Sequence, residues 1–462
     1  MTGAPRSEHH LIIVRREASG EPSVLLLRQG EGWAVPRIDS EERRSADVAE
    51  LNRAVEAALG LEVSVLRCLS DEPAEDGSAR QQLYALEAHG TARPAPAGGR
   101  WVAPGELDGM VPAHSQTRRF REAWLLTGSS FSARADVRDW IQPGWRDEVL
   151  KWVGGELHRR GLPAVSKVEQ IRVWEFSQVL RLETDAGAFY LKARPASGAA
   201  EPLLTLRLAE RHPVSAPAVI AVKPDRRWLL MRATPGPPLM QVDELARWET
   251  AAATIAYIQI DWLEATAELA ALGCRRWTLG GLEAEIAPLL ADVTALQPRH
   301  AEGLTDEEVV ALHRRRLALE DLCRELAGEG VPESLEHGDL WGDNVIAGDA
   351  TTVFIDWEDA AIAHPFFTPA LLLLSLDYTE ALARVPDARR RVREAYLSPW
   401  TERGPLAGWP LQRLERVFDL AQEVALVHYA AQFRRALPLI ETSWEVRAFL
   451  PLFLRRLASN RR

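Results

Sequence analysis

The sequence predicts a mixed α+β protein with more than one domain. Its 462 residues exceed one ordinary domain, so about two or three domains are expected. Short β-branched and apolar runs separated by turn residues dominate the chain up to about residue 236. Long segments with helical periodicity dominate residues 237–462, where a single small hairpin is predicted at residues 345–355.

The composition is typical of a soluble globular protein, with 47% hydrophobic and 26% charged residues. A net charge of −11, without any stretch rich in both basic and aromatic residues, argues against nucleic-acid partners. Cys68, Cys274 and Cys323 lie far apart, which predicts neither disulfides nor a zinc site and favours a reducing cytoplasm. No signal peptide is expected, and no apolar run approaches the ~18 residues of a membrane span.

Residues 1–130 are predicted to form a small α/β domain. Residues 46–59 place apolar side chains on one helical face, and Gly60 follows as the expected C-terminal cap. Four strands are predicted, at residues 11–14, 23–27, 63–69 and 81–87. Residues 131–145, rich in turn formers towards their end, are expected to link this domain to the next.

Residues 146–236 are predicted to form a second domain around a five-stranded sheet. A helix at 146–160 should precede it, and another at 199–211 should follow the third strand. The strands are expected at residues 170–174, 177–183, 188–192, 219–222 and 228–231. Residues 237–462 should then be mostly helical, with helices at 239–272, 282–296, 307–326, 369–376, 387–396, 411–433 and 443–457.

The strongest chemical signal is a pattern of polar residues around the predicted hairpin. His337 and Asp339 lie just before it, Asn344 begins it and Asp356 follows it. The chain contains only three asparagines, so Asn344 at this position is unlikely to be accidental. The hairpin should bring Asp339, Asn344 and Asp356 to one edge, where their oxygens would suit Mg²⁺. A merely polar hairpin turn is the alternative, but it leaves the crowding of acids in an apolar region unexplained.

Two further residues match this pattern from upstream. Lys192 ends the third strand, and it is one of only four lysines in an arginine-rich chain, which indicates a specific need for a compact ammonium group. Glu201, near the start of the next helix, is placed to pair with Lys192 or to cap its helix. The turn at residues 173–178 contains no glycine, although Ser177 could offer a hydroxyl or N–H group to a phosphate.

HGDLWGDN at residues 337–344 and VFIDWED at residues 353–359 resemble the aminoglycoside phosphotransferase family, which shares the bilobal protein-kinase-like fold. The resemblance implies ATP and Mg²⁺ as cofactors, a small lobe at 146–236 and a helical lobe at 237–462. It assigns each site residue a role: Asp339 as catalytic base, His337 as support of the loop, Asn344 and Asp356 as metal ligands, Lys192 on the phosphates, Glu201 on Lys192, Ser177 beside the phosphates, and the backbone of Met231 and Ala233 beside adenine.

The first domain resembles the Nudix fold through Trp33-x-x-Pro36, the helix at 46–59 and Gly60-Leu61. Arg53 matches the arginine of the signature helix, but Ala54, Ala57 and Ala58 replace its metal-binding glutamates. Methyl groups cannot bind a hard metal ion. The domain is therefore expected to be a degenerate Nudix-like domain for docking or regulation, or an unrelated α/β domain, and its removal is expected to leave the chemistry intact.

The leading hypothesis is an ATP-dependent phosphotransferase acting on a hydroxyl of an amino sugar, sugar or amino alcohol. The alternative is a nucleotide-binding regulatory or scaffold protein, which the glycine-free turn and the degenerate first domain favour. An amine-bearing acceptor could be received by acidic residues of the helical region, namely Asp377, Glu423, Glu441 and Glu445. A solvated helix face would explain these acids equally well.

Overall fold

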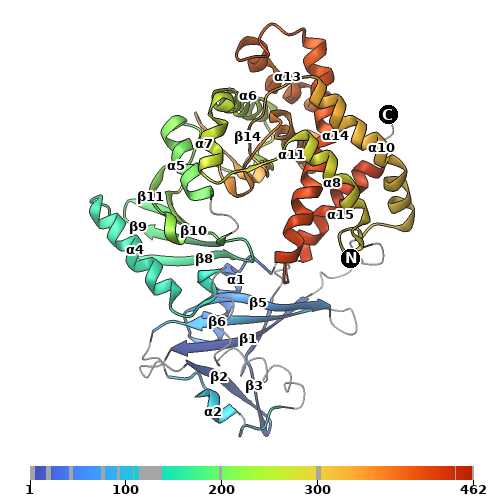
Figure 1. Cartoon of the computed structure of the whole chain (residues 1–462). Helices are drawn as coiled ribbons and strands as arrows, with labels where there is room; N and C mark the ends of the chain where they lie inside the picture. Colours follow the sequence, from blue (N-terminus) through green and yellow to red (C-terminus); the bar gives the residue numbers. More distant parts are fainter. Residues whose placement is uncertain are drawn as a thin grey trace. The chain divides into compact units, whose positions relative to one another are not determined.

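The computed structural model describes residues 6–16, 22–40, 45–73, 79–90, 94–107, 109–113, 138–196, 200–297, 303–442 and 444–459 (Figure 1). The backbone contacts divide the chain into two compact units. The first comprises residues 1–197, 223–231 and 439–444, and the second comprises residues 198–222, 232–438 and 445–462. Residues 131–137 of the predicted linker at 131–145 lie outside the described residues, which resume at Arg138.

The first unit contains a seven-stranded sheet in the order β3-β2-β1-β6-β5, with β4 pairing with β1 and β7 with β2. Strands β1 and β6 are parallel, whereas β1–β2 and β5–β6 are antiparallel, so the sheet is mixed. All four predicted strands of this domain are confirmed, each longer than expected. The strands are β1 (Arg6–Arg16), β2 (Pro22–Gln29), β3 (Gly32–Ala34), β4 (Arg37–Ser40), β5 (Val63–Pro73), β6 (Ala79–Ala88) and β7 (Gly99–Val102).

Helix α1 (Ala49–Leu59) follows β4 and buries Leu51 and Val55. It ends as the sequence predicts, because Gly60 has a left-handed φ of 66° and donates its N–H to the carbonyl of Glu56 at 2.9 Å. A short helix, α2 (Pro104–Leu107), follows β7. The sheet core is aliphatic, with buried side chains from β1, β2, β5, β6 and β7 packed together, including Ile12, Val14, Leu26, Leu66, Leu83 and Val102.

The second sheet has the order β11-β12-β10-β9-β8, so the predicted five-stranded sheet is confirmed. Strands β8–β9 and β9–β10 pair antiparallel as successive hairpins. A β-bulge interrupts the β8–β9 register between Gln170 and Arg172. The strands are β8 (Lys167–Val173), β9 (Gln178–Thr184), β10 (Gly187–Ala193), β11 (Val219–Lys223) and β12 (Trp228–Arg232), preceded by helix α4 (Trp145–Arg159).

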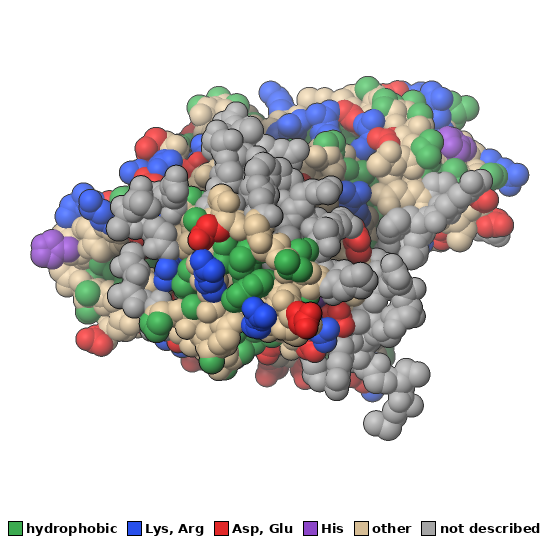
Figure 2. All heavy atoms as spheres, turned by 90° about the horizontal axis from the view of Figure 1, so that it is seen from below, with side chains coloured by type: hydrophobic (Ala, Val, Ile, Leu, Met, Phe, Trp, Pro, Cys, Tyr) green, Lys and Arg blue, Asp and Glu red, His purple; other side chains and the backbone are tan. Residues whose placement is uncertain are grey.

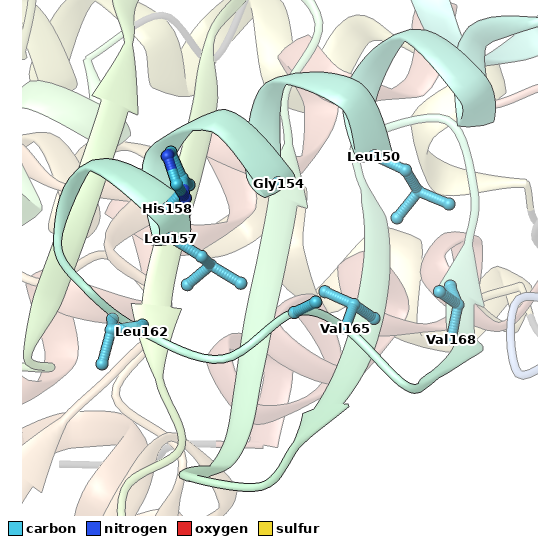
Figure 3. Close-up of a pocket in the computed structure, with 8 residues that line it drawn as sticks. Leu150, Gly154, Leu157, His158, Leu162, Val165 and Val168 are labelled. Carbon is cyan, nitrogen blue, oxygen red and sulfur yellow. The ribbon is translucent and has the colours of Figure 1, made fainter.

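A cavity of about 380 Å³ lies between α4 and the segment that leads into β8 (Figure 3). Its lining is mainly aliphatic, with Leu150 and Leu157 of α4 on one side and Val165 and Val168 on the other. No residue predicted to act in catalysis or in nucleotide binding lines it. The cavity therefore reflects how α4 packs beside the sheet and adds nothing to the candidate site.

Helices dominate the remainder of the chain, as predicted. They are α5 (Glu201–Arg211), α6 (Leu245–Trp262), α7 (Thr266–Ala271), α8 (Leu279–Ala291), α9 (Val293–Leu296), α10 (Asp306–Gly328), α11 (Pro369–Tyr378), α12 (Glu380–Ala383), α13 (Ala388–Glu402), α14 (Leu411–Ala436) and α15 (Trp444–Ser459). Helix α13 packs against α6, and α8 packs against both α10 and α14. Among the described residues, no helix combines the length and apolar character needed to cross a bilayer.

The prediction of continuous helical structure over residues 239–272 is wrong at its start, and a 3₁₀ turn at Leu263–Ala265 also separates α6 from α7. Residues 239–241 form an isolated 3₁₀ turn, Val242 is extended, and α6 begins only at Leu245. The indole Nε1 of Trp248 donates to the carbonyl of Val242 at 3.0 Å, in a fully buried position. This bond satisfies a carbonyl that a continuous helix would have used, so the break is stabilised by tertiary contact that periodicity cannot reveal.

Two small sheets sit among the helices. The order β13-β17-β14 joins β13 (Arg275–Arg276), β17 (Ala361–Ala363) and β14 (Ser334–Glu336). The predicted hairpin is confirmed as the antiparallel pair β15 (Val345–Ala347) and β16 (Thr352–Phe354). Its turn is closed by Gly348, whose N–H donates to the carbonyl of Thr351 at 2.9 Å. The residues just before β15 and just after β16 are those that the sequence singled out.

The described surface mixes charges of both signs. In the view of Figure 2, acidic and basic side chains alternate with apolar ones, and neither sign gathers into a broad patch. This mixture agrees with the many arginine–carboxylate pairs along the chain, such as Arg390 with Glu394 and Arg393 with Asp419.

Candidate active site

The loop from His337 to Asn344 joins β14 to β15 and can be built only around a glycine. Gly338 has a φ of +82°. An added Cβ would lie 2.1 Å from the carbonyl oxygen of Asp359 and 2.5 Å from its carbonyl carbon. The loop backbone therefore passes directly against the residue that follows the hairpin, and this close approach brings the two acidic segments together.

His337 holds the loop from beneath. Its side chain is fully buried, and its ring packs 4.3 Å from the ring of Trp357. The ring Nε2 donates to the carbonyl of Ile355 at 3.1 Å, while Nδ1 accepts the N–H of Asp339 at 3.3 Å. These partners assign the neutral tautomer with its proton on Nε2. Burial agrees, because it lowers the pKa of His337 to about 4 despite the raising effect of nearby carboxylates.

Asp339 is oriented by Asn344. The Nδ2 group of Asn344 donates to Asp339 twice, to its carbonyl at 2.8 Å and to its carboxylate Oδ2 at 3.0 Å. The pKa of Asp339 is raised well above its ordinary value, first by removal from water and then by the negative charges of Asp359, Asp356 and Glu358. The bond from Asn344 opposes this rise. Four carboxyl groups thus converge at the edge of the hairpin.

A second cluster shares Asp356. Carboxylate oxygens of Glu201, Asp356 and Glu358 all lie within 4.8 Å of one another, and Glu201 is only 2% exposed. Asp356 has a left-handed φ of 64°, and a 3₁₀ turn over Trp357–Asp359 follows it. A non-glycine residue in this conformation is uncommon and is often found at functional sites. Within the described part of the chain, this is the group of acids close enough to share a metal ion.

The donor set fits a hard divalent cation. All three carboxylates supply oxygen, which Mg²⁺ and Mn²⁺ prefer. The predicted ligand Asn344 lies close by, since its carbonyl accepts the N–H of Ile355 at 3.0 Å, next to Asp356. Because its Nδ2 is engaged by Asp339, its Oδ1 is the side-chain atom suited to a cation. The structure thus adds Glu201 and Glu358 to the predicted pair.

The residues expected to bind the nucleotide lie on the second sheet or beside it. Lys192 is in β10, opposite Val179 of β9, and is 6% exposed. Ser177 is buried at the start of β9 and accepts the indole N–H of Trp174 on Oγ at 2.7 Å. Met231 is in β12, and Ala233 follows that strand. Lys192 and Glu201 belong to different compact units, and their pairing stays a prediction.

These residues all fall within one sequence match. The model of the phosphotransferase enzyme family matches residues 167–409, just over half of the chain. The chain belongs to this phosphotransferase family. The match begins at the first residue of β8, so it leaves the seven-stranded sheet outside the family's domain. The resemblance of residues 337–359 to the family is thereby confirmed, whereas the Nudix-like resemblance of the first domain stays a prediction.

Several solved structures are distantly similar to this phosphotransferase. A choline kinase from Cryptosporidium parvum is 12% identical with a TM-score of 0.48, covering 67% of this chain and 95% of that one. The GDP complex of an aminoglycoside 2'-phosphotransferase-IIIa mutant is 17% identical with a TM-score of 0.44, covering 67% and 97%. Because both scores are below 0.5, these likenesses decide nothing about the substrate. No curated protein matches the chain.

Two acids that sequence reasoning left without a role lie in the candidate site. Glu358 belongs to the acidic group that could hold a metal ion, and Asp359 has the largest charge effect on Asp339. The signal that could have found them is their spacing from Asp356. A 3₁₀ turn follows Asp356 and brings the residues two and three positions later, Glu358 and Asp359, close to it. Acids at these positions therefore predict a cluster.

A buried polar layer supports the catalytic loop from α14. Glu336, fully buried immediately before His337, accepts the hydroxyl of Tyr429 at 3.2 Å and lies 3.4 Å from Nε2 of His428. Gln432 donates its side-chain amide to the carbonyl of Gly338 at 3.3 Å. One helix, α14, supplies all three partners, so the loop is held by a second element besides the hairpin.

His364, between β17 and α11, should make the free energy of unfolding depend on pH. It is buried against Phe366 and Phe367, and burial lowers its pKa to about 3. An unfolded histidine titrates near 6.5, so between about pH 6.5 and 3 the unfolded chain binds a proton that the folded chain does not. The free energy of unfolding should therefore decrease as the pH is lowered through this window. His364 should contribute up to about 1.4 kcal/mol of this decrease per pH unit.

Urea unfolding at pH 7, 6 and 5 tests this, with His364→Asn predicted to show a shallower loss than the wild type. Exposed His158 on α4 provides the control, since His158→Asn should keep the wild-type slope. Equal slopes for the wild type and His364→Asn would contradict the prediction.

Proposed function

We propose that the chain transfers the γ-phosphate of ATP to a hydroxyl group of a small molecule, with Mg²⁺ as its cofactor. The observation that carries the proposal is the acidic group of Glu201, Asp356 and Glu358, whose carboxylate oxygens lie within 4.8 Å of one another, next to the loop that holds Asp339. Like charges gathered this closely repel one another, and a bound divalent cation would offset that repulsion. Membership of the phosphotransferase enzyme family supports this reading.

Asp339 is the proposed catalytic base. It would orient the acceptor hydroxyl and accept its proton as the phosphoryl group is transferred. Asn344 keeps the Asp339 carboxylate in one orientation through its bond to Oδ2, and His337 fixes the backbone by accepting the N–H of Asp339. His337 is neutral and has both ring nitrogens engaged, so its role is to position the loop.

Asp356, Glu358 and the amide oxygen of Asn344 would hold Mg²⁺. When bound, the ion would neutralise charge that develops on the phosphate oxygens. Lys192 is assigned to the nucleotide phosphates, with Ser177 near them and Met231 and Ala233 beside adenine. Glu201 would both orient Lys192 and complete the acidic group that it forms with Asp356 and Glu358.

The acids expected to receive an amine-bearing acceptor are largely ion-paired. Asp377 lies 2.9 Å from Arg389 and 3.6 Å from Arg456. Glu423 pairs with Arg315, and Glu441 lies 2.7 Å from Arg138. The side chain of Glu445 lies outside the described residues. Three of the four carboxylates are thus already neutralised by arginines. This disfavours an acceptor with several amino groups, because each amino group would need a carboxylate of its own.

Aromatic rings beside the catalytic loop offer a different contact. Trp341, two residues after Asp339, lies 6.1 Å from the ring of Tyr378 and 6.2 Å from that of Phe449. Tyr378 is 56% exposed, so the rings are partly accessible. Aromatic faces bind the apolar face of a sugar or a single alkylammonium group. Sugars and amino alcohols are therefore the acceptors to test first.

The second candidate is a nucleotide-binding regulatory protein with weak or no turnover. The glycine-free turn favours it, because Ser177 already accepts a bond from Trp174 and its hydroxyl is less available to a phosphate. Against it stands the acidic loop, which regulation alone does not require. Turnover separates the two candidates.

The test is ATP turnover, with and without Mg²⁺, against amino sugars, sugars and amino alcohols. We expect Mg²⁺-dependent transfer to at least one of these acceptors. Asp356→Asn should lower kcat by about 100-fold or more, and Glu358→Gln should raise the Mg²⁺ concentration for half-maximal activity about 10-fold. Asp349→Asn, at an exposed acid in the turn of the same hairpin, is the matched control.

Two results would count against the proposal. Binding of ATP without turnover of any acceptor would favour the regulatory protein. Full activity of Asp356→Asn, or activity unchanged by removal of Mg²⁺ with a chelator, would show that the acidic cluster is not a metal site.

A further inference from the structure

The first domain continues into the edge of the phosphotransferase sheet. Residues 46–48, just before α1, run antiparallel to β8, with Asp47 bridged to Arg172. The N–H of Val48 donates to the carbonyl of Ile171 at 3.2 Å, and that of Val173 donates to the carbonyl of Ala46 at 2.9 Å. Strand β8 is the last in its sheet order, so this segment covers an edge that would otherwise be open. Figure 1 shows α1 and β5 beside β8.

Gln170 ties β8 to the first domain more firmly than the bridge alone. It is 5% exposed, and its Oε1 accepts from Nδ2 of Asn52 at 2.9 Å and from the N–H of Val65 at 2.8 Å. Its Nε2 donates to the carbonyl of Val65 at 2.7 Å. The side-chain amide thus pairs with the backbone of β5 as a neighbouring strand would. Removal of this amide would leave buried polar groups of both domains unsatisfied.

Charged pairs surround this buried contact. Arg172 donates through Nε to Asp47 at 3.1 Å, and Arg53 lies 3.8 Å from Glu169. Arg53 is the residue that matched the Nudix-like signature. Arg53 and Asn52 both contact residues of β8, so the helix that lacks the signature glutamates serves as a contact surface.

The same contacts lead directly into the glycine-free turn. Arg172 lies 5.8 Å above the ring of Trp174, and Trp174 closes the turn by donating its N–H to the carbonyl of Ser177 at 3.0 Å. On the other side, Oε1 of Glu175 accepts the N–H groups of Glu441 and Thr442, each at 2.8 Å. All of these residues belong to the first compact unit. The turn is therefore held from both ends.

We propose that the first domain positions the turn at residues 174–177 and thereby sets the affinity of the enzyme for its nucleotide. The inference rests on the proposed function, which places this turn beside the phosphates. Glycine-rich phosphate loops let the backbone approach the ligand closely, but they are flexible and lose conformational entropy when they become ordered. Here a fused domain holds a glycine-free turn in one conformation, so less ordering is needed on binding. Removal of the first domain should consequently weaken nucleotide binding, contrary to the expectation from sequence.

The test uses the full chain and measures the Kd for Mg-ATP by calorimetry, which needs no knowledge of the acceptor. Gln170→Ala removes the buried amide, and Asp47→Ala removes a partly exposed ion pair between the first domain and Arg172 of β8. We expect each to raise the Kd, Gln170→Ala by about 10-fold and Asp47→Ala by about 3-fold. Lys167→Ala, at an exposed position of β8, should leave it unchanged.

Activity measurements add a readout that general damage would not produce. The KM for ATP should rise in both variants while the KM for the acceptor stays constant. Asp47→Ala disturbs no buried group, so it should fold even if Gln170→Ala does not. If both variants fold, an unchanged Kd for Mg-ATP in both would overturn the inference and leave the proposed function standing. If only Asp47→Ala folds, an unchanged Kd in that variant would do the same. Failure of the wild type to bind Mg-ATP would overturn both.

Discussion

Replacement of Asp339 by asparagine should lower the rate of phosphoryl transfer strongly while Mg-ATP still binds. Asparagine has nearly the same shape and can keep the contact with Asn344, but it cannot accept the proton of the acceptor hydroxyl. Loss of a general base lowers kcat by about 10²- to 10⁴-fold. The expected result is a fall of that size in acceptor-dependent ADP release, with the Kd for Mg-ATP within about 3-fold of the wild type.

The control for this variant is Asp349→Asn, which removes one negative charge from the neighbouring turn without touching the loop. It should retain the wild-type kcat. Retention of more than a tenth of the wild-type kcat by Asp339→Asn would show that another group accepts the proton. Asp359, whose charge acts most strongly on Asp339, would then be the residue to replace next.

The residues of this site differ in how far the sequence could predict them. His337, Asp339, Asn344 and Asp356 are local to one loop and one hairpin, where spacing along the chain determines proximity. The structure places Asp339 in direct contact with both His337 and Asn344, and the charge of Asp356 acts on Asp339. The hairpin itself was predictable for the same reason.

Glu201 shows where local reasoning ends. It is separated from Asp356 by more than 150 residues, and its place beside that residue follows from the packing of α5 in the second unit. Spacing cannot encode such a contact. The sequence suggested a pairing with Lys192, which remains a prediction, but gave no sign that Glu201 would share a cluster with Glu358.

The contact between the first domain and β8 was missed for a different reason. Residues 46–48 precede a helix, and an extended segment of three residues leaves no alternating pattern. Gln170 pairs with backbone groups of Val65, and a backbone partner has no identity that a sequence could show. The break before α6 escaped notice similarly, since it depends on one indole bond to a carbonyl.

Replacement of Gly338 by alanine should damage both stability and catalysis. Its φ of +82° disfavours any side chain, by about 1–2 kcal/mol. The added Cβ would also overlap the backbone of Asp359, 2.1 Å from its carbonyl oxygen, and backbone cannot move aside as a flexible side chain can. We expect a total loss of about 3 kcal/mol or more in the free energy of unfolding, and a fall in kcat of at least about 100-fold.

Gly161→Ala separates the two causes. Gly161, after α4, also has a positive φ, of 65°, but an added Cβ there would meet no atom within 4 Å. It should lose about 1 kcal/mol by urea unfolding and keep its kcat. Equal losses in the two variants would show that backbone conformation alone matters at Gly338. A larger loss in Gly338→Ala, with lowered kcat, would show that the contact between the loop and Asp359 holds Asp339 where the reaction needs it.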